Sequence, residues 1–149
     1  MARQLTESDG RIALRDHILE KTAAARTKHG PLIDDTAILK ILGDRTIVRY
    51  PVGIRFDAAP LQAGEFAHPV AFGDHPNHGF CLFIHPVFEK QRDLWPLLFA
   101  YFIPPINYGD IADAEDCELF GASLLGLTVD SYYDALCSIA DAFPPRDSG

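Results

Sequence analysis

Apolar residues recur with a helical period in two segments near the start of the chain, 7–30 and 34–44. In the first segment, Ile12, Leu14 and Ile18 are among the apolar residues that follow a helical period, with charged residues around them. Glycine follows the last periodic residue of each segment, and proline comes directly after the first glycine. Both residues favour the end of a helix, so the pattern predicts two successive helices.

The pattern then changes to β-branched and aromatic residues in partial alternation, which is typical of strands. Pro51 interrupts the first strand or places it at a sheet edge. The connection 73–79, "GDHPNHG", is rich in residues that form turns, which predicts a hairpin-like loop. We therefore expect three strands, at 45–57, 64–72 and 79–86.

Segment 94–103 is apolar nearly all the way round, and a helix without a polar face is buried on all sides. Pro104-Pro105 would end it, and 107–112 would form a turn. Two further helices are expected, at 113–127 and 128–143. The order α-α-β-β-β-α-α-α predicts an α+β domain with a small, three-stranded, mainly antiparallel sheet and a buried central helix.

Composition bounds the class of protein. The chain has 149 residues, 48% hydrophobic and 23% charged, which predicts a single domain, 1–149, with loose termini at 1–9 and 144–149. The formal net charge of −8 argues against nucleic-acid or anionic-membrane partners. No apolar run reaches the roughly 20 residues that span a bilayer, and no signal-peptide pattern opens the chain, so we expect a cytoplasmic location. The three widely spaced cysteines favour reduced thiols.

Four of the six histidines lie in the stretch "AHPVAFGDHPNHGFCLFIHP": His68, His75, His78 and His85, with Cys81 among them. Imidazoles bind zinc, copper and haem iron, and the pair of histidines in the 73–79 loop could supply two ligands. The spacing matches no established zinc signature, however. The other interpretation is that the loop histidines are solvated and that His85 fills a turn.

Three stretches together resemble the ImmA/IrrE-type zinc metallopeptidase family: "AILKILGDRTIVRY", "GFCLFIHPVFEKQRDLW" and "DCELFGASLLGL". They look like the family's first strand, its last strand with the turn into the catalytic helix, and the helix that carries the third zinc ligand. His85-Pro86 stands where the family has an Asn-Pro turn. The resemblance covers roughly residues 10 to 130, and it implies a zincin-like fold.

The family's His-Glu-x-x-His motif places two zinc ligands and a general base on one helical face. In this chain the three positions fall on Leu97, Leu98 and Tyr101. Only the third-ligand position keeps a carboxylate, Asp116. Leucine offers no lone pair to a metal, so the resemblance implies a degenerate member that has the fold without the zinc-peptidase activity.

Two functions remain open at this point. On the first, the domain is a regulatory or protein-interaction module, since family enzymes act on helix-turn-helix regulators, or it holds a small apolar ligand in the former active-site cleft. On the second, it binds haem or a transition metal through the histidine cluster and Tyr101, because both side chains can ligate iron. The sequence assigns no catalytic residue.

Overall fold

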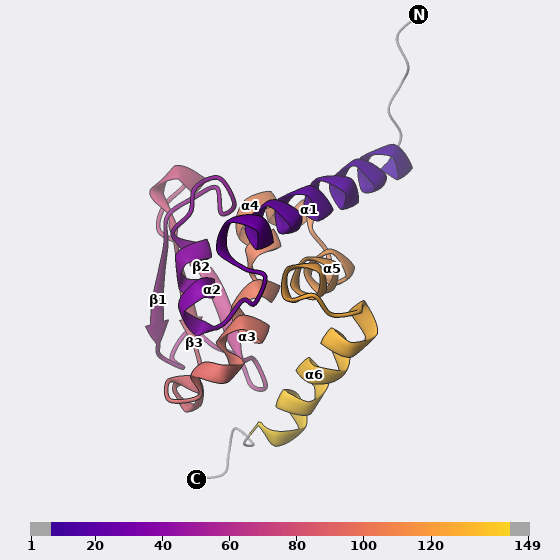
Figure 1. The fold of residues 1–149 in the computed structure, drawn as a ribbon. Coiled ribbons are helices and arrows are strands. Elements are labelled where there is room, and N and C mark those ends of the chain that lie inside the picture. Colours follow the sequence, from indigo (N-terminus) through magenta and orange to yellow (C-terminus); the bar gives the residue numbers. More distant parts are fainter. Residues whose placement is uncertain (1–6, 144–149) are drawn as a thin grey trace, which may run out of the picture.

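The computed structural model describes residues 7–143 as an α+β domain with helices on one side of a small sheet (Figure 1). The elements are α1 (Glu7–His29), α2 (Asp35–Leu42), β1 (Val52–Phe56), β2 (Ala67–Ala71), β3 (Phe80–Ile84), α3 (Trp95–Tyr101), α4 (Ile103–Tyr108), α5 (Ala114–Leu125) and α6 (Val129–Ala142). Because α1 begins at Glu7, the expectation of a loose segment at 1–9 is wrong for its last three residues. Residues 1–6 and 144–149 lie outside the described part.

The sheet has the order β1-β3-β2, with β1 parallel and β2 antiparallel to β3. The sheet is therefore mixed, and the expectation of a mainly antiparallel sheet is wrong. The composition of the strands explains the arrangement. β3, "FCLFI", has no polar residue and takes the central position. β1 carries Arg55, and β2 carries His68 and Pro69, which suit edge strands because such residues oppose further pairing.

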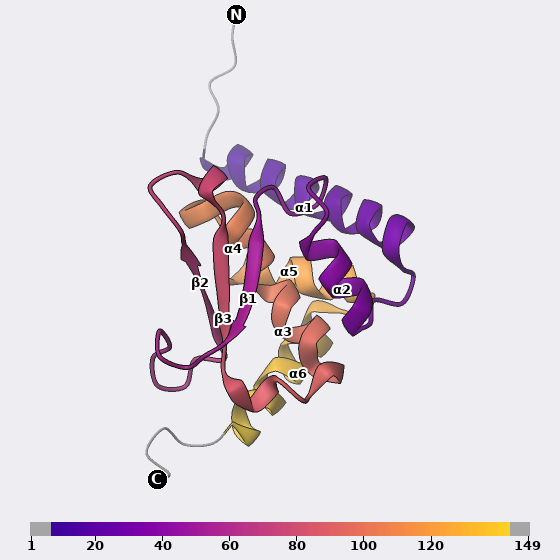
Figure 2. The same ribbon diagram turned by 90° about the vertical axis from the view of Figure 1, so that its left-hand side faces the viewer.

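One face of the sheet packs against the helices, which lie behind it in Figure 2. The register places Ile54 beside Leu82 and Ala67 beside Ile84 on this inner face. Leu82, Ile84 and Ala67 are buried in the main hydrophobic core. The alternate residues face the other way, and among them His68 and Arg55 are exposed.

α3 is the central helix, and it contacts α2, α5 and α6. Trp95, Leu98, Phe99 and Ala100 are buried, as the apolar pattern predicted. The helix is shorter than expected because the chain breaks at Phe102 and starts again as α4. The two prolines that were expected to end the helix lie in the first turn of α4, where a missing N–H leaves no helical hydrogen bond unmade.

The first strand begins at Val52 and not at 45, because Asp44 organises the preceding residues as a turn. Its carboxylate accepts hydrogen bonds from the backbone N–H and the hydroxyl of Thr46. It also pairs with Lys28 and His29 at the end of α1, each at 2.8 Å. These bonds fix the connection from α2 to the sheet. None of the helices within residues 7–143 is long and apolar enough to cross a membrane.

Candidate functional site

The face of α3 to which the family resemblance assigns the zinc ligands lies against α6. Leu97 and Tyr101 are one helical turn apart on α3, so their side chains share a face. The hydroxyl of Tyr132 on α6 donates a hydrogen bond to the backbone carbonyl of Leu97 at 2.6 Å. Tyr132 is fully buried. Its ring passes over Gly121 of α5, where an added Cβ would come within 2.2 Å of it.

Asp116, to which the resemblance assigns the third ligand, has a structural role: its carboxylate is buried and hydrogen-bonded. Its side chain is 2% exposed and accepts a hydrogen bond from Arg11 Nη2 at 2.7 Å. The same Oδ2 atom accepts the backbone N–H of Asp113, while Asp113 accepts the N–H of Asp116, which forms a capping box for α5. The carboxylate therefore joins α1 to the start of α5 instead of pointing free into a cleft.

Two shallow hollows remain beside α6. The first, which we name the Leu97 hollow, is lined by Leu94, Leu97, Ala135, Ser138 and Ile139 among others and measures about 370 Å³. The second, the Tyr101 hollow, is lined by residues that include Phe66, Leu98, Tyr101, Tyr133 and Cys137 and measures about 380 Å³. Leu97 on the one side and Leu98 and Tyr101 on the other are thus divided between two mainly apolar depressions.

The polar groups of the Tyr101 hollow and its surroundings are held in their neutral forms. Burial, assisted by Cys117 and Glu118, raises the pKa of Tyr101 to about 12. Burial, assisted by nearby carboxylates, likewise raises the pKa of Cys117 to about 12. All three thiols are free, but a protonated, buried thiol is a poor nucleophile. At neutral pH both Tyr101 and Cys117 are therefore protonated, which is not the form that acts as a nucleophile or metal ligand.

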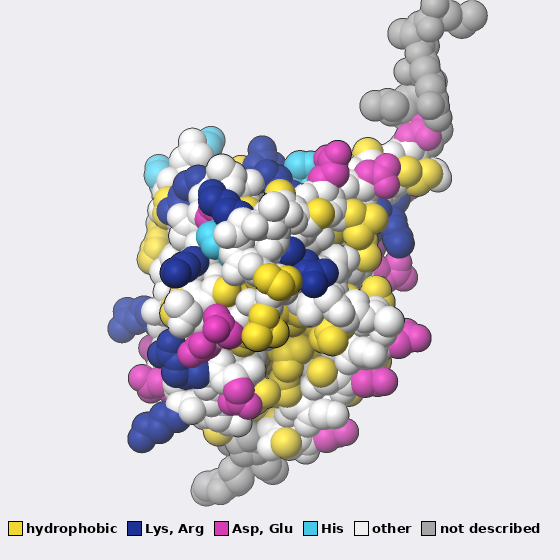
Figure 3. All heavy atoms as spheres, in the orientation of Figure 1, with side chains coloured by type: hydrophobic (Ala, Val, Ile, Leu, Met, Phe, Trp, Pro, Cys, Tyr) yellow, Lys and Arg dark blue, Asp and Glu magenta, His cyan; other side chains and the backbone are white. Residues whose placement is uncertain are grey.

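The surface around the hollows is acidic. Residues 113–142 contain no Lys, Arg or His, and they include Asp113, Glu115, Asp116, Glu118, Asp130, Asp134 and Asp141. Of these, only Asp113 and Asp116 pair with a basic side chain within residues 7–143, and both pair with Arg11. The negative potential acts on Glu118, whose pKa is raised first by burial and then by Glu115 and Asp113. Figure 3 shows hydrophobic side chains gathered where α3 meets α6, with Asp and Glu side chains along the adjoining edge.

Two of the histidines make turns. His75 and His85 each precede a proline, and each accepts a hydrogen bond through Nδ1 from the backbone N–H two residues later, at 3.1 Å. Each thereby caps a short 3-10 turn, at Pro76–His78 and Pro86–Phe88. The His85 ring also packs on Phe143, with ring centroids 4.9 Å apart. The expectation that His85 fills a turn agrees with this geometry.

The other two histidines lie in different surroundings. His68 is on β2, 3.5 Å from the carboxylate of Glu65. His78 packs on Gly73, and its ring centroid is 6.4 Å from that of His75. Tyr101 faces its own hollow beside α6. Within residues 7–143, no three His, Cys, Asp or Glu side chains are grouped so that they could hold a metal ion.

Comparison with protein-family models, with curated proteins and with solved structures found no match to this chain. The candidate site therefore stands on its geometry.

Sequence reasoning missed three residues that shape this site. Tyr132 and Gly121 were not singled out, although a glycine inside an apolar helix signals a close approach by another group. Arg11 was overlooked because its partner is 105 residues away. The burial of Asp116 was also not foreseen, because carboxylates at the start of a helix usually face water.

Proposed function

We propose that this chain is a non-catalytic, zincin-like binding domain whose α5–α6 surface receives a basic, amphipathic segment of a partner protein. The observation that carries the proposal is the pairing of two apolar hollows beside α6 with a 30-residue stretch that has no basic side chain.

The absence of catalysis follows from the chemistry of the positions concerned. Leu97 and Leu98 cannot ligate zinc or activate water, and Asp116 already accepts hydrogen bonds from Arg11 and from the start of α5. Zinc catalysis needs three protein ligands and an open position for water. A hydrogen bond from α6 to the Leu97 carbonyl closes this face further.

The partner's chemistry follows from complementarity. An amphipathic helix places its apolar residues in hydrophobic depressions at helical spacing, and each hollow here has room for one or two large side chains. Lys or Arg residues beside that apolar stripe would meet Glu118, Asp134 and Asp141. The family resemblance points to a regulator protein as the source of such a segment.

Haem is the alternative that the histidines suggested, and the site favours it less. Haem carries two propionates, which the acidic surface would repel. A tyrosine binds iron as phenolate, and the pKa of Tyr101 near 12 opposes that form. His75 and His85 already use Nδ1 to cap turns.

The proposal is tested with three labelled peptides of equal length. One is an amphipathic Leu/Lys helix, the second replaces each Lys by Glu, and the third keeps Lys but replaces each Leu by Ser. Fluorescence anisotropy should detect binding of the Leu/Lys peptide alone, and salt should weaken it because exposed charges are screened.

A matched pair of variants locates the binding. Ser138→Trp fills the Leu97 hollow from an exposed position of α6, whereas Ala24→Trp adds the same bulk on exposed α1. The first should abolish binding and the second should leave it unchanged. The proposal is overturned if the Leu/Lys peptide and the Ser/Lys peptide bind equally well. It is also overturned if the Ser138→Trp variant binds the Leu/Lys peptide as tightly as the unchanged protein does.

A further inference from the structure

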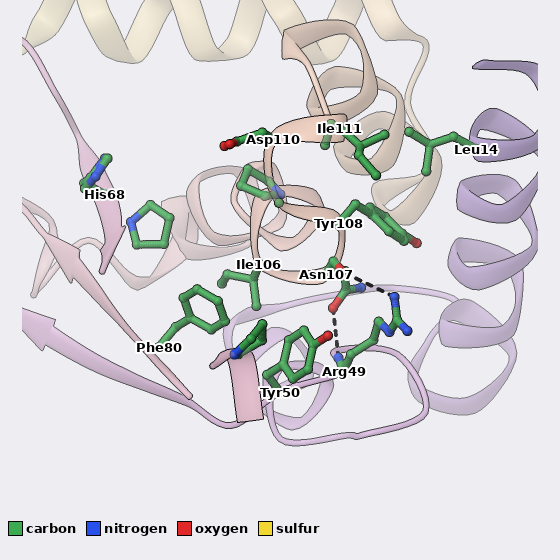
Figure 4. A pocket seen from close by; sticks show the side chains of 15 residues that line it. Leu14, Arg49, Tyr50, His68, Phe80, Ile106, Asn107, Tyr108, Asp110 and Ile111 are labelled. Carbon is green, nitrogen blue, oxygen red and sulfur yellow. Dashed lines mark hydrogen bonds between the residues drawn. The ribbon is translucent and has the colours of Figure 1, made fainter. Parts of the chain in front are cut away.

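A third hollow, of about 810 Å³, lies away from α6, between α4 and the residues that lead into β1 (Figure 4). We name it the Arg49 hollow, and its wall includes Arg49, Tyr50, Phe80, Ile106 and Tyr108. Its volume lies within the range of roughly 300–1,000 Å³ that small-molecule sites occupy. The function proposed above makes no use of it.

A buried amide fixes the polar end of this hollow. Asn107 is 3% exposed, and its side-chain N–H donates to the carbonyl of Ile47 at 2.8 Å. Its side-chain oxygen accepts the backbone N–H of Arg49 at 2.8 Å. Its backbone carbonyl accepts a hydrogen bond from Arg49 Nη1 at 3.3 Å. α4 and the segment before β1 are therefore joined, and the guanidinium is held in place before any ligand arrives.

Arg49 is exposed, and its positive charge has no acidic partner in the part of the chain that the structure describes. Among the ion pairs within residues 7–143, none includes Arg49. The guanidinium lies 5.9 Å from the centre of the Tyr50 ring. Nearby, the Tyr108 hydroxyl is buried without a hydrogen bond of ordinary geometry to the described residues. A guanidinium without an acidic partner at one end of a hollow is suited to an anion.

The middle of the hollow is apolar. The rings of Tyr50 and Phe80 have centroids 6.0 Å apart, and Ile106 lies beside them (Figure 4). At the far end from Arg49, Figure 4 shows Asp110 and, at the edge on β2, His68. The exposed Asp110 carboxylate would repel a second negative charge at that end.

We propose that the Arg49 hollow binds a small organic monocarboxylate with an apolar or aromatic body. The carboxylate accepts hydrogen bonds from Arg49, and the body packs against Tyr50, Phe80 and Ile106. Dicarboxylates of similar length are disfavoured because their second anionic group meets Asp110.

The test uses 3-phenylpropionate, its neutral amide and the dicarboxylate suberate in titrations followed by backbone amide NMR. The acid should shift the amide signals of Arg49, Asn107 and Tyr108. It should bind about tenfold more tightly than the amide, the difference that one charge-assisted hydrogen bond makes. Suberate should bind more weakly than 3-phenylpropionate.

Three variants separate a binding role from a structural one. Arg49→Gln should weaken binding of the acid about tenfold and leave binding of the amide unchanged, because the charge is lost while the backbone hydrogen bond from Arg49 to Asn107 remains. Arg49→Lys should restore part of the affinity for the acid. Arg55→Gln removes an exposed arginine from β1 and should change neither ligand's affinity.

The proposal is overturned if the acid and the amide bind equally, if Arg49→Gln weakens both to the same extent, or if the shifted signals lie on α6. Failure of all three compounds to bind at millimolar concentration also overturns it. None of these outcomes depends on the peptide experiment, so the two proposals fail independently.

Discussion

The Tyr132 hydroxyl of α6 donates its hydrogen bond to the Leu97 carbonyl of α3 at the position that the family resemblance assigns to the first zinc ligand. The bond holds the last helix across the face where a metal cleft would have to open. Tyr132→Phe removes the donor and should lower the free energy of unfolding by about 1 kcal/mol. Urea unfolding measures it, and Tyr133→Phe, half-exposed on the same helix, should change stability much less.

Gly121 provides the space for the Tyr132 ring. A Cβ at this position would come within 2.2 Å of the ring, so Gly121→Ala should destabilise the domain by about 1–3 kcal/mol through overpacking. Gly10 is the matched control, because it is also helical but has nothing within 4 Å of an added Cβ. Gly10→Ala should stabilise the protein by about 0.5–1 kcal/mol. Equal effects of the two substitutions would contradict the packing described for α5 and α6.

Asp116 should prove structural and not catalytic. Asp116→Ala leaves Arg11 and the first turn of α5 without their acceptor, and it should lower the free energy of unfolding by about 1–3 kcal/mol. The same substitution should change neither zinc content nor peptide hydrolysis. A zinc-dependent peptidase activity of the purified protein that Asp116→Ala abolishes would refute the non-catalytic assignment.

The cluster of Asp44 with Lys28, His29 and Thr46 should make the free energy of unfolding depend on pH in the acid range. Hydrogen bonds from Lys28, then Thr46 and His29, hold the pKa of Asp44 far below its usual value. Since the folded pKa is lowered, the contribution is present above the unfolded pKa of about 3.9 and is lost as the pH falls below it. Asp44→Asn should therefore cost about 1–2 kcal/mol at pH 7 and progressively less below pH 4. Asp93→Asn, an exposed substitution, should show no such trend.

His85 should be replaceable by asparagine. An Asn side-chain oxygen can accept the Val87 N–H as Nδ1 does, so His85→Asn should keep the stability that His85→Ala loses, about 0.5–2 kcal/mol. Elemental analysis and a visible spectrum of the purified protein complete the test. A Soret band or a stoichiometric metal that disappears in His85→Asn or in His78→Ala would favour the metal or haem alternative.

Local features of the fold were predictable from sequence, because short-range chemistry decides them. The burial of Leu98, Phe99 and Ala100 in α3 is confirmed, and local capping by Asp34 and Thr128 starts α2 and α6 within the segments expected to be helical. Proline next to an apolar run is ambiguous in sequence, since it suits both the end of one helix and the first turn of the next. That ambiguity explains the missed break at Phe102.

The candidate sites were harder to predict, because they depend on contacts between distant parts of the chain. The four histidines are dense in sequence, but only His75 and His78 have neighbouring rings, while His68 lies beside Glu65 and His85 packs on Phe143. Arg49 and Asn107 meet across 58 residues, and neither carries a motif. The burial of Asn107, which requires partners for its amide, is known only once the fold is known.

The central position of β3 has a consequence for how the chain folds during synthesis. β1 and β2 each pair with β3 and not with each other, so no sheet can form until residues 80–84 have left the ribosome. α1 can complete its packing only later still, because Asp116, the partner of its Arg11 side chain, lies on α5. The first half of the nascent chain therefore emerges with unpaired strand segments. We expect chaperones to protect it from aggregation until the second half has been synthesised.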